Sequence, residues 1–149
     1  FSLVRKVLKV KKIKINKNKY LKKELIKPTK IYVKEIIKLI DKNLINGCAN
    51  ITGGGIEDNI KRVVPNNLCA NIDLDKVKTQ KIFRWLQKSG VTNSEMLKTF
   101  NCGVGFCIII NKKNLNKVKL IFDTKFKPYV IGKISKNKKK VNLSGKINW

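Results

Sequence analysis

The sequence predicts an α+β domain in which helices are layered on a mixed sheet, an α/β/α arrangement. Segments with strand-like and helix-like patterns alternate along the 149 residues. Residues 33–43 repeat apolar side chains at helical spacing, whereas residues 104–110 are a continuous apolar run typical of a buried strand. The length suits one domain and is sufficient to bury a core, so we expect one globular unit.

Two helices are expected in the N-terminal third of the chain. Residues 1–10 place apolar side chains on one face at helical spacing. A connection rich in lysine and asparagine follows, and Lys27 must be extended because the next residue is proline. The amphipathic residues 33–43 then form the second helix, which Asn46 and Gly47 end.

A strand, a glycine turn, a helix and a second strand come next. Residues 48–52 are expected to form a short strand that runs into three successive glycines at 53–55. Residues 56–63 are expected to be helical, and Pro65 stops this helix. Residues 68–74 alternate enough to predict a strand.

Two helices are expected on either side of Gly90. Thr79 is expected to cap a helix that continues through Gln87, and Gly90 provides its stop. Thr92 followed by Glu95 fits a capping box, which predicts a second, short helix.

The C-terminal third is expected to contain a central strand, a helix and two further strands. The apolar run at 104–110 is the candidate for the central, fully buried strand. Residues 115–122 repeat apolar side chains at helical spacing. Residues 129–134 predict another strand, and residues 141–143 predict an edge strand.

The formal net charge of +26 by itself suggests an anionic partner. Nearly all of this charge is lysine, whereas proteins that read nucleic acid rely on the bidentate fork of arginine. Abundant Lys, Asn and Ile are what an AT-rich coding bias produces, so we interpret most of the charge as a solvated surface. We therefore do not expect a nucleic-acid partner, although residues 11–23 and 136–140 remain candidate basic patches.

No stretch resembles a signal peptide, and no apolar run approaches the ~20 residues of a membrane helix, so we expect a cytoplasmic protein without a membrane partner. Because the chain begins with Phe1 rather than methionine, we expect a fragment or a processed product. The cysteines lack Cys-x-x-Cys spacing and the chain has no histidine, so we expect no metal site and small, buried, reduced thiols. These cysteines are Cys48, Cys69, Cys102 and Cys107.

The glycine turn at 53–55 is the candidate anion site. Successive glycines can take positive φ and let a ligand approach the backbone, and the free N–H groups of the following helix point at that ligand. Phosphate suits such a site. The alternative is a tight turn that binds nothing, and the glycines alone do not decide between the two.

Five blocks in the chain resemble, in order and rough spacing, the C-terminal domain of the phosphoribosylformylglycinamidine cyclo-ligases, also called aminoimidazole ribonucleotide synthetases. The blocks are LIKPTKIYV (25–33), GCANITGGGIEDNIKRVVP (47–65), IFRWLQKSG (82–90), EMLKTFNCGVGF (95–106) and VIGKI (130–134), and FSLVRKVL (1–8) resembles the helix that opens that domain. The resemblance covers nearly the whole chain. It implies a partly ferredoxin-like α+β fold over residues 1–149.

The resemblance also implies an enzyme of purine biosynthesis. Such an enzyme uses ATP, accompanied by Mg²⁺, to activate the formyl oxygen of formylglycinamidine ribonucleotide, so that a nitrogen closes the imidazole ring and ADP and phosphate are released. In this family an N-terminal domain carries most of the nucleotide site and the homodimer interface. We therefore expect this chain to supply the C-terminal half of the cleft and to be inactive alone.

The resemblance carries over to twelve candidate residues for binding substrate or phosphate, and it assigns no catalytic residue. They are Gly53, Gly54, Gly55, Asn59, Arg62, Thr29, Lys30, Tyr32, Asn50, Asn101, Gly103 and Gly105. Two of them depart from the family pattern. Asn50 stands where histidine is common and cannot exchange a proton near neutral pH, and Lys30 replaces arginine and lacks its bidentate fork.

Other interpretations stay open. The chain could be a non-catalytic basic module that binds nucleic acid or nucleotide, or a relative with the same architecture, such as selenophosphate synthetase or thiamine monophosphate kinase. The Asn101–Gly105 turn could also be a plain bulge before a buried strand.

Overall fold

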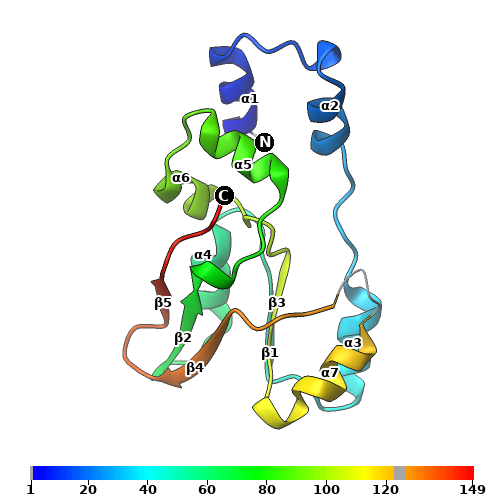
Figure 1. Cartoon of the computed structure of the whole chain (residues 1–149). Helices are drawn as coiled ribbons and strands as arrows, with labels where there is room; N and C mark the ends of the chain where they lie inside the picture. Colours follow the sequence, from blue (N-terminus) through cyan, green and yellow to red (C-terminus); the bar gives the residue numbers. More distant parts are fainter. Residues whose placement is uncertain (1, 123–126) are drawn as a thin grey trace.

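A computed structural model describes residues 2–122 and 127–149 as an α+β fold (Figure 1). Its helices are α1 (Ser2–Val10), α2 (Lys19–Leu25), α3 (Val33–Asp41), α4 (Gly55–Val63), α5 (Lys81–Lys88), α6 (Asn93–Thr99) and α7 (Leu115–Ile121). Its strands are β1 (Gly47–Asn50), β2 (Leu68–Asp73), β3 (Phe106–Ile109), β4 (Gly132–Lys136) and β5 (Val141–Ser144). The described residues also include the 3-10 turns η1 (Ile15–Lys17), η2 (Leu74–Lys76) and η3 (Lys112–Asn114).

The strands within the described residues form two sheets. β1 pairs antiparallel with β3, with Gly47 opposite Ile109. β2 lies between β4 and β5, antiparallel to β4 and parallel to β5. The predicted α+β class with a mixed sheet is therefore confirmed, and β5 is an edge strand as expected.

The helices with clear apolar periodicity are where the sequence places them. The predicted segments 1–10, 33–43, 56–63 and 115–122 correspond to α1, α3, α4 and α7, with Phe1 outside the described residues. The hydroxyl of Thr92 accepts a hydrogen bond from the Glu95 N–H (3.2 Å) and caps α6, as the capping box predicts.

The prediction that 104–110 forms a central, fully buried strand is wrong. Among the described residues β3 pairs only with β1, and its four residues are half-buried. Its side chains are nevertheless all apolar because each face is covered: Phe106 and Ile108 pack against the α3–α7 cluster, and Cys107 and Ile109 pack against the main core. A strand covered on both faces gives a continuous apolar run whether it is central or at an edge.

The lysine-rich stretch after α1 is more ordered than predicted. It contains η1 and the helix α2, and the Asn18 side chain caps α2 by accepting a hydrogen bond from the Leu21 N–H (3.0 Å). Leu21 is fully buried, whereas the neighbouring lysines are exposed. One buried side chain per helix leaves no periodic signal, which is why the sequence predicts only a connection here.

Two further boundaries differ from the prediction. The N-cap residue of α5 is Gln80 rather than Thr79, whose hydroxyl is buried without a hydrogen-bond partner among the described residues. The strand expected at 129–134 begins only at Gly132, and the Tyr129 hydroxyl before it accepts a hydrogen bond from the Lys78 N–H (3.1 Å).

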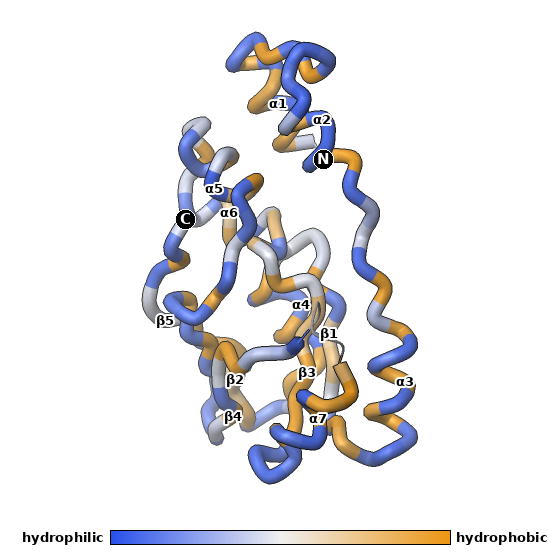
Figure 2. The backbone as a smooth tube through the Cα atoms, turned by 45° about the vertical axis from the view of Figure 1, so that its right-hand side comes forward, coloured by the Kyte–Doolittle hydropathy of each residue, from blue (hydrophilic) through white to orange (hydrophobic). Residues whose placement is uncertain are grey.

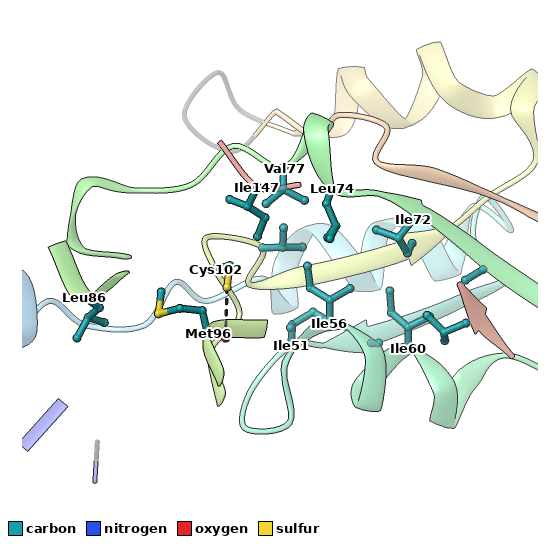
Figure 3. Close-up of a cluster of buried hydrophobic side chains, with 14 of the residues drawn as sticks. Ile51, Ile56, Ile60, Ile72, Leu74, Val77, Leu86, Met96, Cys102 and Ile147 are labelled. Carbon is teal, nitrogen blue, oxygen red and sulfur yellow. Dashed lines mark hydrogen bonds between the residues drawn. The ribbon is translucent and has the colours of Figure 1, made fainter. Parts of the chain in front are cut away.

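Buried apolar side chains form two clusters. In Figure 2, orange marks hydrophobic residues along β3 and α7. The main core lies between α4, β2 and the helices α1, α5 and α6, and Figure 3 shows its centre around Ile51, Ile56 and Ile72. A second cluster joins α3 and α7, which lie side by side, to one face of β1–β3. β1 thus connects both clusters, and the glycine turn directly follows it.

No helix in the described part of the chain is long and apolar enough to cross a membrane.

Candidate functional site

The three glycines of the turn between β1 and α4 have different roles in the structure. Gly54 (φ +91°) and Gly55 (φ +65°) are in the left-handed region, which favours glycine. Gly53 is exposed, its backbone lies outside that region, and an added Cβ would meet no atom within 4 Å. The fold therefore requires glycine at 54 and 55 but not at 53.

Asn59 fastens this turn from within. Its side chain is only 5% exposed, and its Nδ2 donates to the carbonyl oxygens of Gly53 (3.2 Å) and Gly55 (2.7 Å). Both bonds span from the second turn of α4 back to the loop, so they hold the loop in its left-handed conformation. The amide group of Asn59 thus supports the backbone of the turn.

Gly55 is closed off by α6. A Cβ at this position would overlap the carbonyl oxygen of Leu97 and lie 3.2 Å from that of Phe100. α4 and α6 therefore approach each other backbone to backbone, and a ligand has no access to Gly55, which is buried. The accessible backbone of the turn is at Gly53 and, in part, Gly54.

The Asn101–Gly105 turn lies directly beside the residue that leads into the glycine turn. The Ile51 N–H donates to the Gly105 carbonyl oxygen (3.0 Å), and the Asn101 Nδ2 donates to the Ile51 carbonyl oxygen (3.5 Å). Asn101 also accepts a hydrogen bond from the Gly103 N–H (3.1 Å), which closes its own turn. Gly103 packs its backbone against Lys78, where a Cβ would lie 2.8 Å from the carbonyl oxygen.

Tyr32 links a third block to the same place. Its hydroxyl lies against Gly105, where a Cβ would overlap it, and its ring packs on Phe106 with centroids 5.3 Å apart. Burial raises the pKa of the Tyr32 hydroxyl above its ordinary value. The structure therefore brings Tyr32, Asn101, Gly103, Gly105 and the glycine turn together at one end of β1 and β3.

Of the other candidate residues, Thr29, Lys30 and Arg62 lie outside this cluster, and Asn50 lies at its edge. Thr29 and Lys30 are exposed in the segment that runs between α2 and α3 along the side of the molecule (Figure 1). Asn50 is the exposed last residue of β1, opposite Phe106. Arg62 is exposed on α4, about two helical turns from the glycines.

Two surface hollows flank α4 and share Asp58. The first, of about 400 Å³, we call the basic hollow; it is lined by Asp58, Lys61, Arg62 and Lys140. The second, of about 280 Å³, we call the acidic hollow; it is lined by Gly54, Glu57, Asp58, Leu97, Lys98 and Leu143. Lys61 and Lys140 line the basic hollow but are not among the candidates predicted from the sequence, although Lys140 belongs to the basic run 136–140 and Lys61 precedes Arg62.

The charges separate the two hollows chemically. Glu57 and Asp58 in the first turn of α4 already interact with the positive end of the helix dipole, and they oppose an anion there. The basic hollow carries three cationic side chains and one carboxylate. Electrostatics therefore favours phosphate beside Arg62 rather than at the helix N-terminus.

The described residues contain no group of three or more His, Cys, Asp or Glu side chains that could hold a metal ion. All four cysteines are free; Cys69 and Cys102 are buried, whereas Cys48 and Cys107 are half-buried. Burial raises the pKa of Cys102 and of Cys107 to about 12, so neither is a reactive thiolate at neutral pH.

Comparison with known proteins places these features in one family. The family described as "AIR synthase related protein, C-terminal domain" matches residues 1–143. A phosphoribosylformylglycinamidine cyclo-ligase from Neisseria gonorrhoeae is 40% identical over 124 residues, which cover 80% of this chain and 36% of that protein. The proteins of the same name from Thermodesulfovibrio yellowstonii and Streptococcus agalactiae are 41% identical over 144 residues and 43% identical over 119 residues. These two matches cover 91% and 79% of this chain, but 42% and 34% of the respective relatives.

Proposed function

Because the chain belongs to the family of AIR synthase related proteins, as their C-terminal domain, we propose that it forms the C-terminal part of a phosphoribosylformylglycinamidine cyclo-ligase of purine biosynthesis. The reaction is the ATP-dependent closure of the imidazole ring of formylglycinamidine ribonucleotide, with release of ADP and phosphate. The role proposed for this chain is to bind the phosphorylated ribonucleotide along the exposed side of α4.

The observation that carries this proposal is Gly53. Neither backbone conformation nor packing requires glycine at this position. A ligand that lies directly against the main chain does require it, because any side chain would occupy the ligand's place. Gly53 is also the exposed residue of a turn that Asn59 holds rigidly from inside.

The charges suggest how the ribonucleotide is oriented. Its phosphate is proposed to lie in the basic hollow, where Arg62 offers a bidentate fork and Lys61 and Lys140 add positive charge. Its ribose then lies toward Gly53 and Gly54, on the other side of Asp58. Tyr32 and Asn101 hold the backbone next to the turn and do not need to contact the phosphate.

Titration calorimetry with formylglycinamidine ribonucleotide tests the binding role. Gly53→Asp adds a carboxylate at an unstrained, open position, so it is expected to weaken binding at least tenfold, whereas Gly53→Asn adds similar bulk without charge and should weaken it less. Arg62→Gln should weaken binding of the ribonucleotide but not of its dephosphorylated riboside. Arg5→Gln on α1 removes the same charge elsewhere and serves as the control. Equal effects of Arg62→Gln and Arg5→Gln would contradict the orientation.

Turnover is proposed to need more of the enzyme than this chain. The chain spans about 34–42% of the length of the curated relatives it matches. ATP and Mg²⁺ are proposed to bind mainly to an N-terminal domain that also forms a homodimer, and ATP supplies the phosphoryl group that activates the formyl oxygen. Glu57 and Asp58 face the acidic hollow, and two carboxylates would hold Mg²⁺ only together with further ligands such as substrate phosphates.

A chimera tests whether turnover needs an N-terminal domain in addition to this chain. In it, the chain replaces the matched region of the Thermodesulfovibrio yellowstonii relative. The chimera is expected to release phosphate from ATP only when formylglycinamidine ribonucleotide is present, and the Gly53→Asp chimera is expected to lose that activity. Ring closure by the chain alone would refute the proposal that the second domain is necessary.

A further inference from the structure

We infer that residues 144–149, here called the C-terminal segment, hold helix α6 in place as a wall of the acidic hollow, with Trp149 as the positioning residue. The importance of this hollow rests on the proposed function, because Gly54 of the substrate turn lines it. The attachment of the segment to α6 stands on contacts of its own. The family match ends at residue 143, so the segment lies beyond the part of the chain that the family comparison covers.

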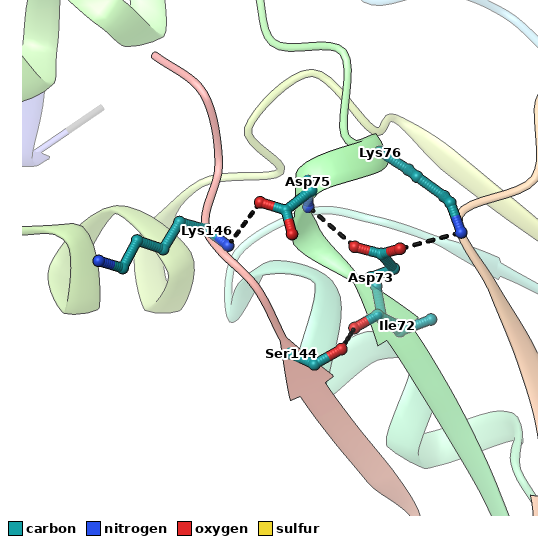
Figure 4. Close-up of polar contacts among 6 residues, drawn as sticks. All are labelled: Ile72, Asp73, Asp75, Lys76, Ser144 and Lys146. Carbon is teal, nitrogen blue, oxygen red and sulfur yellow. Dashed lines mark hydrogen bonds and ion pairs between the residues drawn. The ribbon is translucent and has the colours of Figure 1, made fainter.

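The segment is first anchored at the end of the mixed sheet (Figure 4). The Ser144 hydroxyl donates to the Ile72 carbonyl oxygen (3.4 Å), and the Lys146 N–H donates to the Asp75 Oδ1 (3.1 Å). Asp75 in turn donates its own N–H to the Asp73 Oδ1 (3.1 Å). These bonds direct the chain away from β5 and along η2.

The segment then enters the main core. Ile147 is 7% exposed and lies beside Val77 and Leu74, as Figure 3 shows. Burying this side chain favours the docked position of the segment, since exposing it again would return its apolar surface to water. The residues on either side of it are exposed, so Ile147 is the apolar anchor.

Trp149 completes the connection to α6. Its ring packs against the main core, and its Nε1 donates to the Asn93 Oδ1 (2.9 Å). Asn93 is the first residue of α6, directly after the capping residue Thr92. The segment therefore runs from β5 to the N-terminal end of α6.

α6 depends on such contacts because it has only seven residues, too few for a helix that is stable by itself. Its Leu97 and Lys98 line the acidic hollow, and the carbonyl oxygen of Leu97 packs against Gly55 of the turn. Leu143, immediately before the segment, lines the same hollow. A shift of α6 would therefore change the hollow and the support of the glycine turn together.

Hydrogen exchange and binding, measured on the full chain, test the inference. Trp149→Phe keeps an aromatic ring and removes the Nε1–H donor, and Asn93→Ala removes the acceptor. Each is expected to speed exchange of the α6 amides of Met96 and Phe100 several-fold and to weaken binding of formylglycinamidine ribonucleotide several-fold. The double variant should add little to either single change, because both remove the same hydrogen bond. Asn93→Asp keeps an acceptor oxygen and places a favourable negative charge at the N-terminal end of α6, so α6 exchange should be no faster than in the unmodified chain.

Val118→Ala is the control for general destabilisation. Val118 is fully buried in the second cluster, away from α6. This variant should lower the Tm without changing α6 exchange or binding well below the Tm. If Trp149→Phe leaves α6 exchange unchanged, or if Val118→Ala speeds it equally, the inference is wrong. If α6 exchange rises but ribonucleotide affinity does not change, the segment does not position the site. If the unmodified chain binds no ribonucleotide, the proposed function fails, and the exchange comparison still decides whether the segment holds α6.

Discussion

Replacing Gly55 with alanine is expected to destabilise the fold far more than the same replacement two residues earlier, at Gly53. Gly55 has a φ of +65°, and a Cβ there would overlap the Leu97 carbonyl oxygen, lie 3.0 Å from the Leu97 carbonyl carbon and lie 3.2 Å from the Phe100 carbonyl oxygen. All three atoms belong to the backbone of α6 or its end, so no side chain can rotate away. The whole helix would have to move.

The magnitude follows from two contributions. The left-handed conformation costs an alanine roughly 1–2 kcal/mol, and overpacking against the α6 backbone costs about 1–3 kcal/mol, so the free energy of unfolding should fall by roughly 2–5 kcal/mol. This is a large part of the ~5–15 kcal/mol that stabilises a typical domain. At Gly53 neither contribution applies, and a change between zero and about 1 kcal/mol of stabilisation is expected because alanine restricts the unfolded chain.

Gly54 provides the intermediate case. Its φ is +91°, and the nearest atom that a Cβ would meet is the Cβ of Asp58 at 2.9 Å, which moves only with the backbone, whereas the Asp58 Oδ2 at 3.0 Å belongs to an exposed carboxylate that can turn aside. The expected loss is therefore the conformational contribution of roughly 1–2 kcal/mol plus the lower end of the overpacking contribution, about 1 kcal/mol, because only a small backbone shift of α4 is needed. The three single alanine variants thus form a graded series.

Urea unfolding followed by circular dichroism measures the series. With an m-value of about 2 kcal/mol per molar urea, Gly55→Ala should move the midpoint down by roughly 1–2.5 M. The order of stability should be Gly53→Ala, then Gly54→Ala, then Gly55→Ala. If Gly55→Ala and Gly53→Ala unfold at the same urea concentration, the close approach of α4 and α6 is not as described, and the assignment of Gly53 to a ligand loses its structural basis.

Three further outcomes are expected. Asn59→Leu removes both hydrogen bonds to the glycine turn and should lower the free energy of unfolding by about 1–3 kcal/mol in urea titrations. An unchanged free energy of unfolding would show that Asn59 does not hold the turn. The hydrogen bond from Lys76 holds the pKa of the Asp73 carboxyl below its usual value. This bond therefore stabilises the fold at pH values above the pKa of Asp73 in the unfolded chain, and the stabilisation is lost as the pH falls through its pKa in the folded chain. Lys76→Met should raise the pKa of Asp73 in the folded chain, as measured by a carbon-detected NMR titration. Cys102 and Cys107, with pKa values of about 12, should resist iodoacetamide at pH 8 until urea unfolds the chain, and rapid labelling of either thiol in native buffer, seen by mass spectrometry, would contradict their burial.

The helices that could be predicted from the sequence are those with a local signal. α3 shows apolar side chains at helical spacing, and α6 has a capping box that the structure reproduces at Thr92. α2 could not be predicted, because its helix depends on one buried residue, Leu21, and on a cap at Asn18 within a run of lysines. The N-cap of α5 was predicted one residue early because threonine is a good cap by itself, whereas the backbone of Thr79 packs against Gly103.

The arrangement of the strands was less accessible to prediction, because strand pairing is a long-range property. The apolar pattern of β3 correctly indicates that both of its faces are buried, but the same pattern fits a central strand and a strand with one partner. Nothing local distinguishes a single sheet from two. The order β4–β2–β5 joins strands more than 60 residues apart in the sequence, as the pairing of Ala70 with Ile134 and with Val141 shows.

The candidate site depends both on local sequence motifs and on long-range packing. The motif residues around the glycine turn are recognisable in the sequence, but their roles are not. From the sequence alone, Gly53, Gly55 and Asn59 are equally good candidates for binding a ligand. In the structure, Gly55 and Asn59 build the turn, whereas Gly53 and part of Gly54 stay accessible.

Lys140 shows why the charge around Arg62 could be predicted only in part: the basic run 136–140 is visible in the sequence, but its place beside Arg62 is not. It lies 78 residues from Arg62 in the sequence, and its carbonyl oxygen accepts a hydrogen bond from the Ala70 N–H (2.9 Å) where β5 begins its parallel pairing with β2. That pairing brings Lys140 to the same hollow as Lys61 and Arg62 on α4. The positive charge proposed to receive phosphate is therefore produced by sheet topology as much as by the motif. A lysine among 35 basic residues acquires a specific role only through the strand beside which it is placed.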